Sequence, residues 1–68
     1  MSHGSKEPYE VSHVRVHRET RIALLVAIDD RLIWIPKSQV LDDSEVQGEG
    51  DEGALVIPEW LAIERGIV

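Results

Sequence analysis

The strongest constraint on the fold is a pair of apolar segments separated by two aspartates. In residues 21–28, one face of an extended chain would consist of Ile22, Leu24, Val26 and Ile28, and the other of Ala23, Leu25 and Ala27. Residues 31–35 are also apolar after an initial arginine. A strand that is apolar on both faces is usually central and covered on both sides. With the turn signal Asp29-Asp30 between them, the two segments predict a tight β-hairpin.

The remaining segments predict a small, mostly β architecture. They are a strand at 9–17 with a β-bulge at Ser12-His13, a turn at 18–20, a helical turn at 37–41, a strand at 54–57 and a helix at 58–65. Pro58 suits the first helical turn, and Gly66 suits a left-handed cap after which Ile67 folds back on Leu61 or Ala62. The expected fold is α+β, mostly β: a small bent antiparallel sheet, or an SH3-like partly open barrel, of about four strands with one short C-terminal helix.

The length of 68 residues allows one domain with a modest core. A domain of this size buries only about 60% of the surface that its unfolded chain exposes. The absence of Cys excludes disulfides and thiolate metal sites, and fits a reducing compartment. No apolar run approaches the roughly 20 residues that span a bilayer, and polar residues 1–10 do not resemble a secretory signal. We expect a flexible leader at 1–8 and a single domain at 9–68.

Residues 42–53 form an acidic segment, with six acidic residues and three glycines among twelve. This composition predicts a solvated, mobile loop whose only anchor is Val46, so that a neutral Gly/Ser linker could replace residues 44–52 without loss of the fold. The segment lacks the ligand spacing and flanking helices of a calcium-binding EF-hand. It also matches no phosphate-binding loop, since no lysine follows its glycines and its carboxylates repel phosphate.

The formal charge of −6 is unevenly distributed. Residues 1–21 carry a net charge of +1, whereas residues 22–68 carry −7. An acidic body of this kind disfavours general nucleic-acid binding. His13 and His17 could share a zinc ion on a helix, but on a strand they would lie about 13 Å apart. We therefore interpret them as surface histidines and expect no metal site.

No combination of residues indicates catalysis. The serines have no supporting base, and the paired aspartates lie in turns where water screens them. A chain this short also has little room for a sheltered cleft. We predict no catalytic residues, no cofactor and no enzymatic activity.

Candidate binding residues come from the first strand and from the two tryptophans. If Val14 and Val16 point inward, His13, Arg15 and His17 point outward together, with Arg18 and Arg21 close by. The preferred interpretation of this arrangement is protection of a strand edge. The alternative is contact with phosphate or with an acidic protein. One or both tryptophans fill the core, although Trp is also typical of binding hot spots. The candidate binding face consists of His13, Arg15, His17, Arg18, Arg21, Lys37, Trp34 and Trp60.

Two motifs flank the acidic segment: Trp34-Ile35-Pro36-Lys37-Ser38-Gln39 before it, and Ile57-Pro58-Glu59-Trp60-Leu61-Ala62 after it, with Gly66 closing the pattern. This pattern, over residues 21–68, resembles small uncharacterised proteins encoded by bacteriophages and prophages. The resemblance implies a bacterial cytoplasmic setting. It also implies a class in which many members bind host or phage proteins, some as inhibitors of host defence. It carries no established activity.

The expected function is that of a small, non-enzymatic acidic interaction module that binds a protein partner, and the resemblance implies that it is phage-derived. Surplus apolar surface also predicts a homodimer or a docking face. The first alternative is an accessory nucleic-acid-binding domain that uses the basic face, namely His13, Arg15, His17, Arg18, Arg21 and Lys37. The second is an inhibitor whose acidic loop imitates DNA. We expect no membrane partner.

Overall fold

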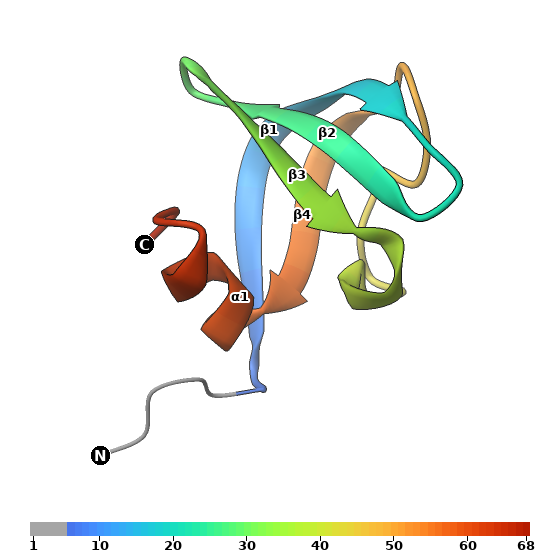
Figure 1. Cartoon of the computed structure of the whole chain (residues 1–68). Helices are drawn as coiled ribbons and strands as arrows, with labels where there is room; N and C mark the ends of the chain where they lie inside the picture. Colours follow the sequence, from blue (N-terminus) through green and yellow to red (C-terminus); the bar gives the residue numbers. More distant parts are fainter. Residues whose placement is uncertain (1–5) are drawn as a thin grey trace.

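The computed structural model describes residues 6–68, which form four strands and two short helices. The strands are β1 (Pro8–Glu19), β2 (Ala23–Ile28), β3 (Arg31–Pro36) and β4 (Glu52–Pro58), and the helices are η1 (Lys37–Gln39), a 3-10 turn, and α1 (Glu59–Glu64). The strands form one antiparallel sheet in the order β3-β2-β1-β4 (Figure 1). This confirms a small, mostly β α+β fold with a C-terminal helix, in which the sheet curls without closing.

The domain begins earlier than the sequence predicts. Residues 1–5 of the expected leader at 1–8 lie outside the described residues. Pro8 is the first residue of β1 and pairs with Pro58, and the carbonyl of Glu7 accepts a hydrogen bond from the amide of Glu59 at 2.8 Å. Because these contacts join residues 7 and 8 to β4 and α1, both residues belong to the domain.

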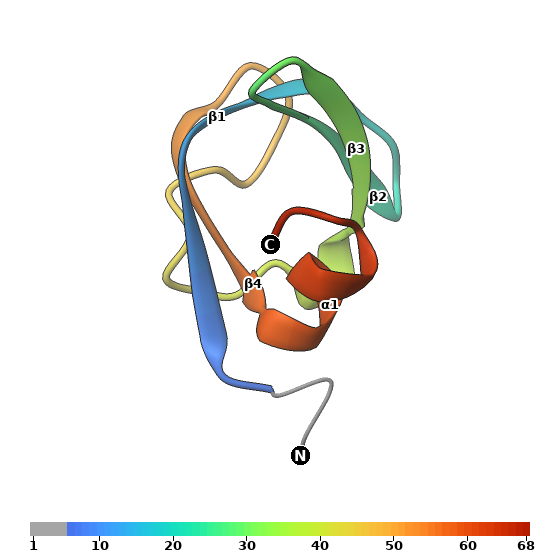
Figure 2. The same ribbon diagram turned by 90° about the vertical axis from the view of Figure 1, so that its left-hand side faces the viewer.

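β1 is a long strand that bends across the sheet. Its first half pairs with β4 and its second half with β2. Figure 2 shows β1 rising beside β4 and then curving over toward β2. The expected turn at 18–20 begins too early, because β1 continues to Glu19. The turn follows at Thr20, whose hydroxyl accepts hydrogen bonds from the amides of Ile22 and Ala23 at 3.3 and 3.0 Å.

Two β-bulges accompany this bend. The first lies between Val11 and Val14 in the pairing with β4, where the sequence predicts it. It contains His13, whose φ of 60° lies in the left-handed region that non-glycine residues seldom adopt. The second lies between Val16 and Arg18 in the pairing with β2, and the sequence pattern does not reveal it. Each bulge bends the strand and increases its twist, which curls the sheet.

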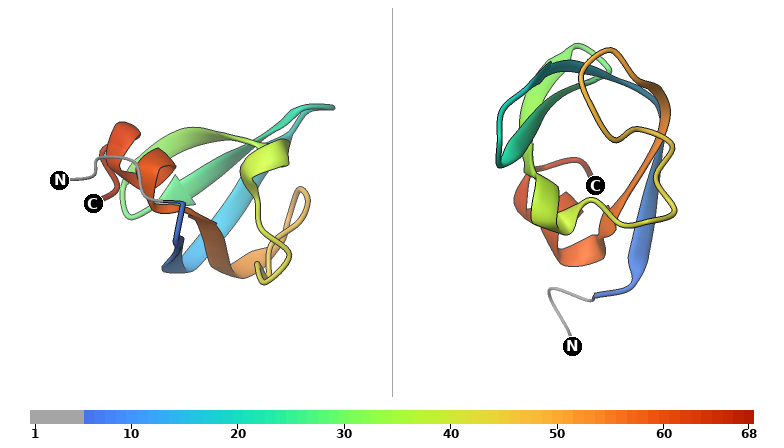
Figure 3. Two further views of the ribbon diagram at one scale, coloured as in Figure 1. Left: turned by 90° about the horizontal axis from the view of Figure 1, so that it is seen from below. Right: turned by 90° about the vertical axis from the view of Figure 1, so that its right-hand side faces the viewer.

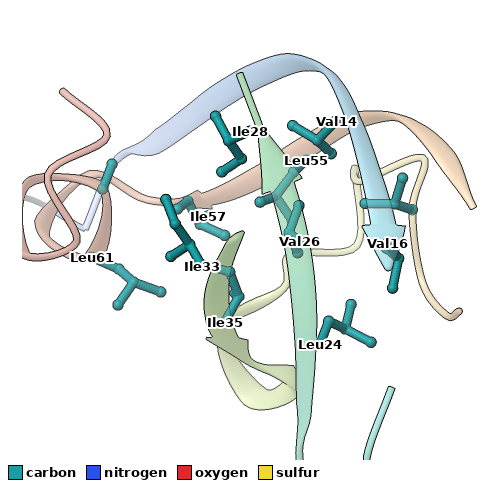
Figure 4. Packing of buried hydrophobic residues seen from close by; sticks show 12 residues of the cluster. Val14, Val16, Leu24, Val26, Ile28, Ile33, Ile35, Leu55, Ile57 and Leu61 are labelled. Atoms are coloured by element: carbon teal, nitrogen blue, oxygen red, sulfur yellow. The ribbon is translucent and has the colours of Figure 1, made fainter. Parts of the chain in front are cut away.

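The core lies on the concave side of the curled sheet. Its side chains come from all four strands, from α1 and from the loop after η1 (Figure 4). They are Val14, Val16, Leu24, Val26, Ile28, Ile33, Ile35, Val46, Leu55, Ile57, Leu61 and Ala62. The inward orientation of Val14 and Val16 is thus confirmed. The expectation that Ile22 shares this core face is wrong, because it lies in the turn before β2 and is 73% exposed.

α1 lies at the open side of the curled sheet, between the ends of β3 and β4 (Figure 2). Pro58 ends β4 and is the N-cap of the helix. The prediction that it lies in the first helical turn is therefore wrong by one position. Gly66 ends the helix with a φ of 74°, as predicted. The amide of Gly66 donates to the carbonyl of Ile63 at 3.0 Å, and that of Ile67 donates to the carbonyl of Ala62 at 2.8 Å. These are the two hydrogen bonds of a Schellman motif.

The acidic segment 42–53 is fastened to the domain at several points. Val46 is completely buried in the core. A carboxylate oxygen of Asp51 accepts hydrogen bonds from the amides of Gln47 and Gly48 at 2.8 and 3.0 Å. Figure 3 shows the loop folded back along β4. The expectation that Val46 is its only anchor is therefore wrong, because the carboxylate of Asp51 also holds the loop through hydrogen bonds to its backbone.

The loop before β4 covers the edge of that strand, and the side chain of Arg65 contacts the edge of β3. Along β4, the amide of Glu45 donates to the carbonyl of Ala54 at 2.8 Å. Along β3, Nε of Arg65 donates to the carbonyl of Trp34 at 3.1 Å, and Nη2 of Arg31 donates to the carbonyl of Arg65 at 3.0 Å. The covered edge of β4 leaves few backbone groups to which a further strand could add. Because the core fills the concave side, the broad accessible surface of the sheet is its convex face.

Candidate functional site

The convex side of β1, β2 and β3 combines apolar and cationic side chains, and we refer to it as the outer face. It consists of Arg15, Arg18, Leu25, Ala27, Leu32 and Trp34. The strand register arranges these residues in two rows across the sheet. In the first row, Arg18 lies opposite Leu25, and Leu25 lies opposite Trp34. Because neighbouring strands are about 4.8 Å apart, the row is about 10 Å long.

The second row of the outer face runs from Arg15 through Ala27 to Leu32. The large apolar side chains at the β3 end are open to solvent, with Leu32 55% exposed and Trp34 45% exposed. At these exposed fractions, no segment within residues 6–68 covers this end of the face completely. The expectation that β2 is covered on both sides is therefore wrong, although β2 does lie inside the sheet.

β1 supplies the cationic end of the outer face. The preferred interpretation of its charges as protection of a strand edge is wrong, because β1 lies between β2 and β4. Nε of Arg15 lies 3.5 Å from Oε2 of Glu52, and both side chains are 67% exposed. Exposed ion pairs of this kind contribute little to stability. Arg18 forms no ion pair within the described residues, so both guanidinium groups remain accessible to a partner.

Three predicted residues lie near the outer face but not in its rows. His13 and His17 occupy the two bulges of β1, so neither has a directly opposite partner in the register. Arg21 lies in the turn between β1 and β2. All three are exposed. They extend the basic character of this side of the domain without joining the apolar rows.

Lys37 lies apart from the other predicted basic residues. Its Nζ donates a hydrogen bond to Oε2 of Glu19. Glu19 is opposite the buried Leu24 in the register, which places it at the end of the concave side of the sheet. Lys37 is therefore a structural contact of the domain and not part of the outer face.

Glu19 joins three segments at this end of the domain. Besides the bond from Lys37, its Oε1 accepts a hydrogen bond from the amide of Glu49 at 3.1 Å. The hydrogen bond from Lys37, followed by that from Glu49, lowers the pKa of Glu19 below its ordinary value. β1, η1 and the acidic loop are thus connected through a single carboxylate, which the sequence pattern does not single out.

The two tryptophans occupy different environments. Trp34 is exposed on the outer face, so only Trp60 can be the tryptophan that was expected to pack in the core. Trp60 is half-buried on α1 and packs against the core, while Leu61 and Ala62 beside it are almost completely buried. Trp60 therefore attaches α1 to the core and does not belong to the outer face.

The surface hollows are open and shallow. One, of about 480 Å³, is lined by His13, Val14, Arg15, Glu52 and Gly53 at the first bulge. Another, of about 270 Å³, lies along β4 and is lined by Pro8, Glu10, Asp43, Glu45, Ala54 and Val56. Nowhere in the described part of the chain do three or more His, Cys, Asp or Glu side chains gather as a metal ion would require. Neither helix found in residues 6–68 has the length and apolar character needed to cross a membrane.

Sequence reasoning missed Leu25, Ala27 and Leu32 as members of the candidate surface. A signal for them exists, because residues 21–28 and 31–35 are apolar at consecutive positions. This pattern indicates more apolar surface than one core can cover. It does not indicate which face is the core, since either register of the hairpin would bury apolar side chains.

Comparison of the chain with protein-family models, with curated proteins and with solved structures gives no match. The candidate function therefore rests on the geometry of the outer face.

Proposed function

We propose that this domain is a non-enzymatic interaction module that binds a protein partner through the outer face. The observation that carries this proposal is the exposure of Trp34 and Leu32 beside Leu25 on a face that no described segment covers. Tryptophan buried at the centre of an interface is among the side chains whose removal most weakens binding. The resemblance to small phage and prophage proteins supports a bacterial cytoplasmic setting and a phage or host protein as the partner.

Affinity capture from a bacterial lysate tests this proposal. The baits are the parent chain, Trp34→Ala, and Ile63→Ala as a control, because Ile63 is 46% exposed on α1 and lies outside the outer face. We expect a protein that the parent and the Ile63 variant retain and that the Trp34 variant loses. Retention of the same proteins by all three baits would contradict the proposal.

Self-association is a second candidate, favoured by the same exposed apolar side chains. An interface of a homodimer is more apolar than an ordinary surface, and the outer face supplies two large apolar groups at the β3 end. Sedimentation equilibrium of the parent and of Trp34→Ala at high micromolar concentration separates the candidates. A dimer mass that the Trp34 variant reduces to a monomer mass would assign the outer face to a second copy of the chain.

A further inference from the structure

The outer face is chemically asymmetric, and the asymmetry defines a complementary surface. Trp34 and Leu32 form its apolar end on β3, whereas Arg18 and Arg15 form its cationic end on β1. The two ends are about 10 Å apart, the width of three neighbouring strands. A complementary partner therefore presents apolar groups and anionic groups about 10 Å apart, a distance that a short peptide segment can span.

The cations at this face lack strong partners within the domain. Arg18 has no ion-pair partner in the described part of the chain, and the contact of Arg15 with Glu52 is exposed and 3.5 Å long. A contact of this kind contributes little, so it opposes a competing carboxylate only weakly. Both guanidinium groups can form bidentate hydrogen bonds with a carboxylate.

The edges of the sheet offer a partner less than this face does. At the edge of β3, Nε of Arg65 donates a hydrogen bond to the carbonyl of Trp34. The acidic segment covers the edge of β4. The convex face is therefore the broadest surface of the sheet that a partner can contact. Recognition then depends on the chemistry of the six residues of the outer face.

We infer that the outer face binds an acidic segment of a partner protein, with apolar side chains over Leu25, Leu32 and Trp34 and carboxylates at Arg15 and Arg18. This inference rests on the proposed interaction function and specifies the chemistry of the partner. A second copy of the chain fits less well, because a symmetric interface would contain four arginines with only the two Glu52 side chains to balance them. Phosphate backbones fit less well because the chain carries a net charge of −6.

The two arginines act at short range. The net charge of −6 repels an acidic partner at long distance, so the field of the whole domain does not accelerate the encounter. At physiological salt the Debye length is about 8 Å, so each arginine interacts appreciably only with charged groups within about that distance. We therefore expect the arginines to affect how long a complex lasts more than how fast it forms.

Selection from a random peptide library tests the partner chemistry. The peptides are about ten residues long, enough to cross the outer face at ~3.3 Å per residue. The baits are the parent chain, the double variant Arg15→Glu with Arg18→Glu, and Trp34→Ala. The matched control is Lys6→Glu with Arg21→Glu, which changes the net charge equally at two exposed residues outside the outer face. Circular dichroism and amide spectra establish that each bait is folded.

We expect the parent and the control to select peptides that are acidic and carry apolar side chains. A synthetic peptide of the selected composition should bind the Arg15/Arg18 variant about tenfold more weakly, as two exposed charge contacts contribute. The Arg15/Arg18 variant should itself select basic peptides. Chemical shifts on titration with the synthetic peptide should change at the six residues of the outer face.

The inference is overturned if the parent selects neutral or basic peptides, or none above an empty support. Binding that Trp34→Ala abolishes and the Arg15/Arg18 variant retains would leave the proposed function standing and refute the acidic partner. Binding that neither variant weakens would refute both. Tighter binding of oligothymidylate than of any selected peptide, with loss in the Arg15/Arg18 variant, would replace the acidic protein segment by a nucleic acid.

Discussion

The hydroxyl of Ser44 bonds both backbone groups of Val56: it accepts from the amide at 2.8 Å and donates to the carbonyl at 3.0 Å. Ser44 therefore takes the place of a neighbouring strand at the edge of β4. Both residues are buried, so water does not substitute for these hydrogen bonds. The amide of Leu41 also donates to the carbonyl of Val56, at 2.9 Å, which leaves the Val56 amide as the group that depends on Ser44 alone.

Replacement of Ser44 by alanine should lower the free energy of unfolding by about 2 kcal/mol, because one buried amide loses its acceptor. Urea denaturation measures the effect. Ser38→Ala is the matched control, since Ser38 is exposed in η1, and its midpoint should stay near that of the parent. Equal midpoints for the two variants would show that the Ser44 hydroxyl is dispensable.

The acidic loop should resist replacement. Exchange of residues 44–52 for a neutral Gly/Ser linker removes Val46 from the core and the hydrogen bonds of Asp51. We expect the thermal midpoint to fall by more than about 10 °C. Val46→Ala alone should destabilise by about 2 kcal/mol, whereas Asp42→Ser, at an exposed position, should change little. An unchanged midpoint for the linker variant would restore the view of this segment as an unattached loop.

Leu61 should matter more to stability than the larger Trp60 beside it. Leu61 is 1% exposed, whereas Trp60 is only half-buried. Leu61→Ala should cost about 3 kcal/mol, and Trp60→Ala should cost less because part of its ring already contacts water. Thermal unfolding of the two variants compares them directly. A larger loss for Trp60 would place its ring among the main supports of the core.

Glu19 should make stability depend on pH in the acidic range. Its pKa is lowered in the folded chain, chiefly by the hydrogen bond from Lys37, so its contribution is complete above the ordinary value of 4.5 and disappears as the pH falls through the folded value. The parent should therefore be more stable than Glu19→Gln at pH 7, and the difference should shrink below pH 4.5. Glu49→Gln serves as the control for loss of a carboxylate. A difference that is constant with pH would contradict this linkage.

Gly53 should not tolerate a side chain. It has a φ of 143°, and a Cβ there would lie 2.5 Å from Oε1 of Glu45. That oxygen accepts a hydrogen bond from the amide of Ala54. Gly53→Ala should therefore destabilise through both backbone strain and displacement of Glu45, by about 2 kcal/mol or more. Gly50→Ala provides the control, because Gly50 has a positive φ with open space around its Cβ position. A cost no greater than that of Gly50→Ala would mean that Glu45 moves aside freely.

The alternating pattern predicts the strands well where one face is buried. The pattern places Leu24, Val26 and Ile28 on a common face, and all three lie in the core. The same pattern extends one residue too far at Ile22, because an apolar residue in a turn looks like a strand residue in sequence. The hydroxyl of Thr20 decides where the strand begins, and its role depends on the position of the folded backbone.

The bulges of β1 limit what the sequence predicts about the candidate site. The bulge at His13 is visible because the apolar alternation changes phase there. The bulge between Val16 and Arg18 follows the last apolar residue of the strand, so no later apolar position records it. As a result, simple alternation puts His17 on the same face as Arg15, whereas the register gives that position to Arg18. Contacts across the sheet, such as Arg18 opposite Leu25, depend on the register and are not visible in local sequence.

The pairing of β1 with β4 has a consequence for synthesis on the ribosome. Val11 pairs with Leu55, so the first half of β1 finds no partner until a loop of about forty residues has closed, an event that is slow relative to local hairpin formation. The β2–β3 hairpin can form earlier, with apolar residues on both of its surfaces. A nascent chain that stalls before β4 would therefore expose Val14, Val16 and the inner face of this hairpin to chaperones and proteases.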